Sequence, residues 1–181
     1  MCNPVLGDVF LKEYTIYTSG VKIGKLDWEV DIDNKHYSNN IRLRSSGLLS
    51  ALYNFEGNYF SSGSIINKML NPKNYNHHWK TSKANKTMSL IFGGNKLKSL
   101  KQSPREEEEL RLDIYNVIKT KDPLSSFLQI ILGANTSLVI DGRRLYRMSA
   151  VYDKNLRQVT VGIADYSNLW TDHKKNDFEK I

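Results

Sequence analysis

Most of this sequence alternates between apolar and polar residues with a period of two, which restricts the chain to a β-rich fold. The clearest example is Lys25–Ile32, where Leu26, Trp28, Val30 and Ile32 alternate with acidic residues. Successive strand residues point to opposite faces, so such a segment offers one face to a core and the other to solvent. Turn residues separate the alternating segments, and together they predict an antiparallel meander.

The pattern predicts strands along most of the chain. They are Lys12–Thr18, Lys25–Ile32, Tyr37–Ser45, Phe55–Ser62, Thr136–Ile140, Arg143–Tyr152 and Gln158–Tyr166. Between Ile65 and Leu100 we expect several more, separated at Asn71-Pro72, at 83–85 and at the hairpin turn 93–95. The segment after Ser103 resembles a helix-opening capping box, but it also alternates from Leu110 onward. We favour an extended connection there.

One stretch, Lys121–Gly133, has a helical pattern. Asp122 suits the N-cap, Pro123 the first turn, and Gly133 a left-handed stop. Its apolar residues recur at helical spacing; they are Leu124, Phe127, Leu128 and Ile131, widened by Ile130 and Leu132. We therefore predict a mainly β fold, in which a strongly curved antiparallel sheet or open β-barrel holds one short helix, about 122–132, in or against its hollow.

Length and composition fit one domain that needs no disulfide. The chain has 181 residues, and Cys2 is its single cysteine. The net charge of +7 favours contact with anionic surfaces, including a peripheral membrane surface. We interpret 1–7 as the remnant of a signal peptide, 8–170 as one β-rich domain, and 171–181 as a polar tail, with a truncated C-terminal hairpin as the alternative. Gly47–Tyr53 suits one or two helical turns.

Four stretches, in this order and spacing, resemble a known group of bacterial envelope proteins, the domain of unknown function 3108 family. They are YTIYTSGVKIGKLDWEV at Tyr14–Val30, SSGLLSALYNFEGNYFSSG at Ser45–Gly63, KDPLSSFLQI at Lys121–Ile130 and DGRRLYRMSA at Asp141–Ala150. The resemblance implies export to the periplasm and a strongly curved sheet or open barrel, similar to periplasmic carriers that hold lipid in a hollow. The family has no established activity, so it supplies no catalytic residues.

Several residue groups suggest chemistry, but each has a simpler explanation. His77 and His78 invite a metal site, yet adjacent strand residues point to opposite faces. Asp172-His173, near Ser167, lacks the nucleophile elbow of a hydrolase. A glycosidase-like site could use the carboxylates of one strand face, which are Asp27, Glu29 and Asp31. A solvated outer face explains them without chemistry, and we favour that interpretation. Aromatic residues interleaved with basic ones fit a nucleic-acid surface, but export argues against it.

The candidate ligand site joins the helix to the hollow of the sheet. Its apolar wall would be Trp28, Phe127, Leu128 and Ile131. The densest cationic cluster is next to Tyr146, where Arg143 and Arg147 would share one strand face and contact an anionic headgroup or glycan. We expect a non-enzymatic periplasmic domain without cofactor or metal, binding an apolar or amphipathic ligand or an envelope partner: a lipid, a glycan or a protein. The alternatives are a scaffold with a filled core and, less favoured, a hydrolase of envelope polymers.

Overall fold

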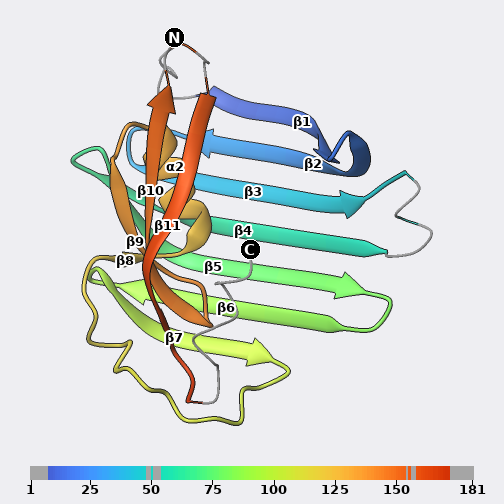
Figure 1. The fold of residues 1–181 in the computed structure, drawn as a ribbon. Coiled ribbons are helices and arrows are strands. Elements are labelled where there is room, and N and C mark those ends of the chain that lie inside the picture. The colour runs from blue at the N-terminus through green and yellow to red at the C-terminus, as the bar shows by residue number, and fades with distance from the viewer. Residues whose placement is uncertain (1–7, 48–49, 51–53, 154, 156–157, 172–181) are drawn as a thin grey trace.

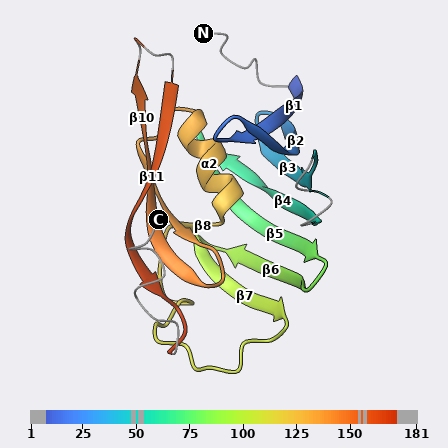
Figure 2. The ribbon, with the colours of Figure 1, turned by 45° about the vertical axis from the view of Figure 1, so that its right-hand side comes forward.

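The computed structural model describes residues 8–47, 50, 54–153, 155 and 158–171, which form two sheets with a helix between them (Figures 1 and 2). In the larger, antiparallel sheet each strand pairs with its neighbour in sequence, in the order β1 to β7. The strands are β1 Asp8–Thr18, β2 Val21–Ile32, β3 His36–Ser45, β4 Phe55–Ile66, β5 Met69–Thr81, β6 Asn85–Gly93 and β7 Lys96–Ser103. The predicted meander is confirmed.

The second sheet has four strands in the order β11-β10-β9-β8. Its members are β8 Thr120–Lys121, β9 Thr136–Ile140, β10 Arg144–Asp153 and β11 Gln158–Asn168. β8 and β9 are parallel, and helix α2, Pro123–Ile131, makes the crossover between them. The other pairs are antiparallel. The long strands of this sheet cross those of the first, with α2 in the space between the two layers (Figure 2).

The helix begins and ends as its sequence predicts. The Asp122 side chain accepts a hydrogen bond from Ser125 N at 2.9 Å, and Pro123 occupies the first turn. At the other end Gly133 has φ +107°. Gly133 N donates to Ile130 O at 2.9 Å and Ala134 N to Gln129 O at 3.1 Å, the two bonds of a Schellman motif.

Both sheets bury the helix, so its buried surface is wider than one apolar stripe. Leu128 packs in a cluster from β2 to β5, whereas Ile130 packs in a second cluster on β9 and β10. Ser125 and Gln129 are buried as well, although they are polar. Ile131, predicted to be on the apolar face, is 47% exposed. A single apolar stripe on a helix predicts packing against one layer, whereas α2 packs against two sheets.

The prediction of a strongly curved sheet or open β-barrel is wrong. Neither sheet is closed, because β1 and β7 are opposite edges of the larger sheet and do not pair. An apolar sheet face can be covered by curling on itself or by a second layer. Here α2 and the four-stranded sheet supply that layer, so the larger sheet stays open.

The predicted break at Asn71-Pro72 is also wrong. β5 continues through it from Met69 to Thr81, and a register shift between Ser62 and Gly63 of β4 accommodates Pro72 opposite Gly63. The extended connection after Ser103 is confirmed, since 104–119 contains no helix. The expectations for 1–7 and 172–181, and most of those for Gly47–Tyr53, fall outside the described residues. No helix in the described ranges is long and apolar enough to span a membrane.

Candidate functional site

An open cavity of about 710 Å³ lies on the inner face of the larger sheet, beside the N-terminus of α2. In Figure 1, α2 and the second sheet lie over one end of the strands of this face and leave the other end uncovered. Aliphatic side chains form much of its floor; they are Leu26, Ile41, Leu43, Met88 and Leu124. Aromatic rings line the rest; they are Tyr59, Tyr75, Trp79 and Tyr146.

The register of the sheet brings these residues together. Ile41 of β3 is opposite Tyr59 of β4, which is opposite His77 of β5 and then Met88 of β6. This row crosses four strands on one face, because directly paired residues of an antiparallel sheet share a side. Alternation in each strand makes the row apolar or aromatic, apart from His77. The composition of the cavity floor is thus set by the way the strands pair.

Three polar groups in the wall are uncharged: the His77 imidazole and the phenols of Tyr59 and Tyr75. Glu106 and Asp141 also line the cavity. Burial lowers the pKa of His77 to about 4, so its imidazole is neutral at pH 7. Its Nδ1 lies 3.2 Å from the hydroxyl of Tyr75. Burial also raises the pKa values of Tyr59 and Tyr75, which keeps both phenols protonated. These groups can exchange hydrogen bonds with a ligand, but they bring no charge into the cavity.

Two cations stand at the rim. Lys86 Nζ lies 5.5 Å from the centroid of the Trp79 ring. Arg143 lies in the turn before β10, where Asp141 Oδ1 accepts from the backbone nitrogens of Arg143 at 2.9 Å and Arg144 at 2.7 Å. Burial raises the pKa of Asp141. Both cationic side chains are exposed and line the cavity, so an anionic group could bind at this rim.

Only one of the six predicted ligand-site residues, Arg143, lines this cavity. Trp28 and Phe127 pack together with ring centroids 5.6 Å apart, and the Trp28 indole donates to Asn39 Oδ1 at 2.7 Å. Leu128 is buried on the side of α2 that faces the larger sheet, as described above.

The two predicted arginines are not brought together. Arg147 lies in β10, does not line the cavity, and its Nε is 3.6 Å from Asp165 Oδ2. Arg143 precedes β10, which begins at Arg144, and lies in the turn held by Asp141. The shared strand face inferred from their spacing is therefore not formed.

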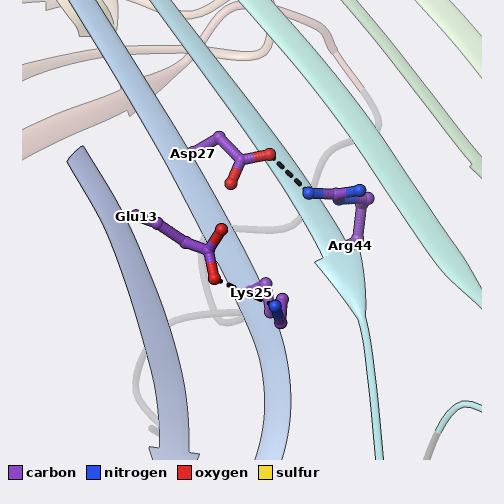
Figure 3. Close-up of polar contacts among 4 residues, drawn as sticks. All are labelled: Glu13, Lys25, Asp27 and Arg44. Carbon is purple, nitrogen blue, oxygen red and sulfur yellow. Dashed lines mark hydrogen bonds and ion pairs between the residues drawn. The ribbon is translucent and has the colours of Figure 1, made fainter. Parts of the chain in front are cut away.

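The predicted acidic face lies on the opposite side of the sheet from the cavity. Figure 3 shows its charge pairs: Asp27 with Arg44 at 2.5 Å, and Glu13 with Lys25 at 2.9 Å. Glu29 and Asp31 are exposed. The carboxylate of Asp27 is paired with a cation, and none of the three predicted carboxylates lines the cavity.

The two adjacent histidines lie on opposite faces, as predicted. His77 faces the cavity, whereas His78 Nε2 contacts Asn85 Oδ1 at 2.6 Å on the other side. Across the described ranges, no group of three His, Cys, Asp or Glu side chains could hold a metal ion.

A buried polar network fastens α2 to the larger sheet. The Asp122 carboxylate is 0% exposed and accepts from the hydroxyls of Ser61 at 3.0 Å and Ser125 at 2.5 Å. The Tyr37 hydroxyl lies 2.6 Å from Ser125 Oγ, and Asn39 donates to Leu124 O at 3.1 Å. This network sets the position of the helix N-terminus, and therefore of the cavity wall. Sequence reasoning assigned Asp122 to the cap but missed its partners on β3 and β4.

Comparison with known proteins gives one match. A family model described as "Protein of unknown function (DUF3108)" matches residues 13–152. The match contains nearly all of the strands described above and the whole of α2. No curated protein and no solved structure matches the chain.

Proposed function

The chain belongs to the DUF3108 family of proteins of unknown function, and we propose that this member is a non-enzymatic binding protein that holds an amphipathic ligand in the cavity beside α2. The observation that carries the proposal is the combination of an aliphatic and aromatic floor with Lys86 and Arg143 at the rim. A volume of about 710 Å³ lies within the usual range for small-molecule sites.

The lining favours a ligand with an apolar body and an anionic end. Leu26, Leu43 and Met88 would bury the body, which gains about 25 cal/mol for each Å² of apolar surface removed from water. The anionic end would lie between Lys86 and Arg143. The neutral phenols and imidazole of the wall could accept or donate hydrogen bonds to a linker between the two parts.

A scaffold with a completely filled core is the alternative, and the open cavity counts against it. If α2 filled the space over the sheet, no ligand could enter. Instead α2 covers one end of the strands, and its first turn forms one wall of the space that is left. The proposal keeps the periplasm as the site of action, because the stretches that resemble exported envelope proteins overlap the matched region.

A cavity-filling substitution should weaken ligand binding strongly. We expect anilinonaphthalene sulfonate, a fluorescent probe with an apolar ring system and one anionic group, to bind the protein saturably and to be displaced by oleate. Leu43→Trp places an indole on the cavity floor and should weaken probe binding at least about tenfold. Arg143→Ala should weaken it by about threefold, through loss of an exposed charge contact. Fluorescence titration measures both effects.

The matched control is Leu11→Trp, which makes the same change at an exposed position of β1 far from the cavity lining. It should bind the probe as the unaltered protein does. Circular dichroism and thermal unfolding confirm that each variant is folded. Unchanged binding by folded Leu43→Trp would refute the proposal, as would equal weakening by Leu11→Trp.

A further inference from the structure

The outer face of the larger sheet, opposite the cavity, carries a second hollow with different chemistry. A groove of about 520 Å³ runs over β3 to β7. Two cross-strand rows form most of it. One row passes from Asn40 through Phe60, Asn76 and Ser89 to Lys101. The other contains Asn58, His78, Thr87 and Ser103. The other lining residues are Tyr59, His77, Met88 and Gln102, which also line the cavity, as do Thr87 and Ser103 of the rows.

Nearly all of these side chains are uncharged hydrogen-bonding groups. Lys101 is the one Lys, Arg, Asp or Glu among the described residues that line the groove. This contrasts with the net charge of +7 for the chain and with the charged face over β1 to β3 in Figure 3. A groove of this kind has little attraction for a polyanion, because binding of nucleic acid or another polyanion depends on clustered cations.

The amides of the groove are available to a ligand. Within the described part of the chain, the side chains of Asn40, Asn58 and Asn76 have no hydrogen-bonding partner. Each amide carries two donors and an acceptor. Strands lie about 4.8 Å apart, so the amides of neighbouring strands form a closely spaced array of donors and acceptors. Such an array is complementary to groups that both donate and accept, such as the hydroxyls of a sugar.

An aromatic ring lies within this array. Phe60 is 39% exposed and pairs directly with Asn40 on one side and Asn76 on the other. An exposed aromatic face gives an apolar C–H surface a place to stack, while the amides beside it bind the polar edge. Pyranose rings have this combination of an apolar face and a hydroxyl-bearing edge.

We infer that the outer face of β3 to β7 binds a neutral glycan chain, with a sugar ring stacked on Phe60 and its hydroxyls bonded to Asn40, Asn58 and Asn76. The side chains of Asn40, Phe60 and Asn76 are on the opposite face of the sheet from the cavity beside α2, and the inference does not depend on the amphipathic ligand proposed for that cavity. A protein with both sites could hold an amphipathic molecule on one face of the sheet while the other face rests on a polysaccharide.

Nuclear magnetic resonance titration of the labelled protein tests the inference with soluble hexasaccharides. The probes are chitohexaose, cellohexaose and maltohexaose, each added to about 5 mM to detect millimolar affinity. We expect at least one to shift backbone amide signals of β4, β5 and β6 saturably. Phe60→Ala and Asn76→Ala should each weaken that binding at least about fivefold, since central aromatic and hydrogen-bonding contacts dominate an interface.

The matched control is Ile91→Ala, which truncates another exposed apolar side chain on the outer face of β6, outside the groove. It should leave glycan binding unchanged. Leu43→Trp should also leave it unchanged, which separates this site from the cavity. The inference is overturned if none of the three sugars binds. It is equally overturned if binding survives Phe60→Ala, or if Leu43→Trp abolishes it.

Discussion

Replacement of Gly63 with alanine is expected to lower the free energy of unfolding by about 4 kcal/mol, the range in which only severe local conflicts fall. A Cβ at this position would lie 2.1 Å from Asn71 O and 2.9 Å from Pro72 Cα. Both neighbours are backbone atoms of the paired strand β5, so neither can move without breaking the register. Urea denaturation followed by circular dichroism measures the loss.

Gly93→Ala is the control for this prediction. Gly93 is also a strand glycine, but the nearest atoms to an added Cβ are those of the Lys98 side chain, at 3.4 Å. That side chain is flexible and can move aside, so the change should alter stability by less than about 0.5 kcal/mol. Similar costs for the two variants would contradict the close approach of β4 and β5 at Gly63.

Replacement of Asp122 with alanine is expected to cost about 3 kcal/mol, from loss of an N-cap together with unsatisfied buried donors. The carboxylate accepts from Ser125 N, Ser125 Oγ and Ser61 Oγ, and all of these groups are buried. Asp113→Ala removes an exposed carboxylate that bonds a neighbouring asparagine, and it should cost less than about 0.5 kcal/mol. Thermal and urea unfolding measure both. Equal losses would show that the network does not hold α2.

The same carboxyl should leave a signature in the pH dependence of stability. Burial raises the pKa of Asp122 above its ordinary value of 3.8. Between the two values the folded state binds more protons than the unfolded chain, so stability falls as the pH rises through this window and is constant above it. Asp122→Asn should lack this decrease.

Asp33 provides a contrast of opposite sign. Hydrogen bonds from the backbone nitrogens of Lys35 and His36 lower its pKa. Its contribution to stability is present above 3.8 and is lost as the pH falls through the lowered pKa. The unaltered protein should therefore lose stability as the pH falls below about 3.8, and Asp33→Asn should remove this part of the loss. The Asp122 assignment fails if Asp122→Asn and Asp33→Asn change the profile in the same direction.

Local patterns were sufficient to locate the helix and most strands. Asp122, Pro123 and Gly133 act on their own backbone neighbourhood, so their roles could be read without knowledge of the fold. Alternation in Lys25–Ile32 likewise indicates which face of the strand is buried, and it can be seen in the sequence alone. The turn predicted at Asn71-Pro72 failed because β5 accommodates Pro72 opposite Gly63, beside a bulge that leaves Lys73 without a partner on β4. No local pattern reveals this pairing.

The candidate site was harder to predict because it depends on which parts of the larger sheet are covered by α2 and the second sheet. The apolar stripe of α2 pointed to Phe127 and Leu128 as cavity wall. Both are instead part of the packing, because Leu128 packs against the larger sheet and Phe127 against the cluster on β9 and β10. The cavity lies where that second layer stops short of the strand ends. The cross-strand row of Ile41, Tyr59 and His77 exists only once the register is known.

By itself, then, the sequence determined a β-rich chain, the bounds and caps of α2, the family, and the opposite orientation of His77 and His78. Each follows from rules that act over a few neighbouring residues. Only the tertiary structure decided that the larger sheet stays open, that Ser61 bonds Asp122 while Tyr37 bonds Ser125, and that a cavity and a largely uncharged groove lie on the two faces. Those outcomes depend on contacts between residues far apart in the chain, and their geometry is set by how the two sheets and the helix pack.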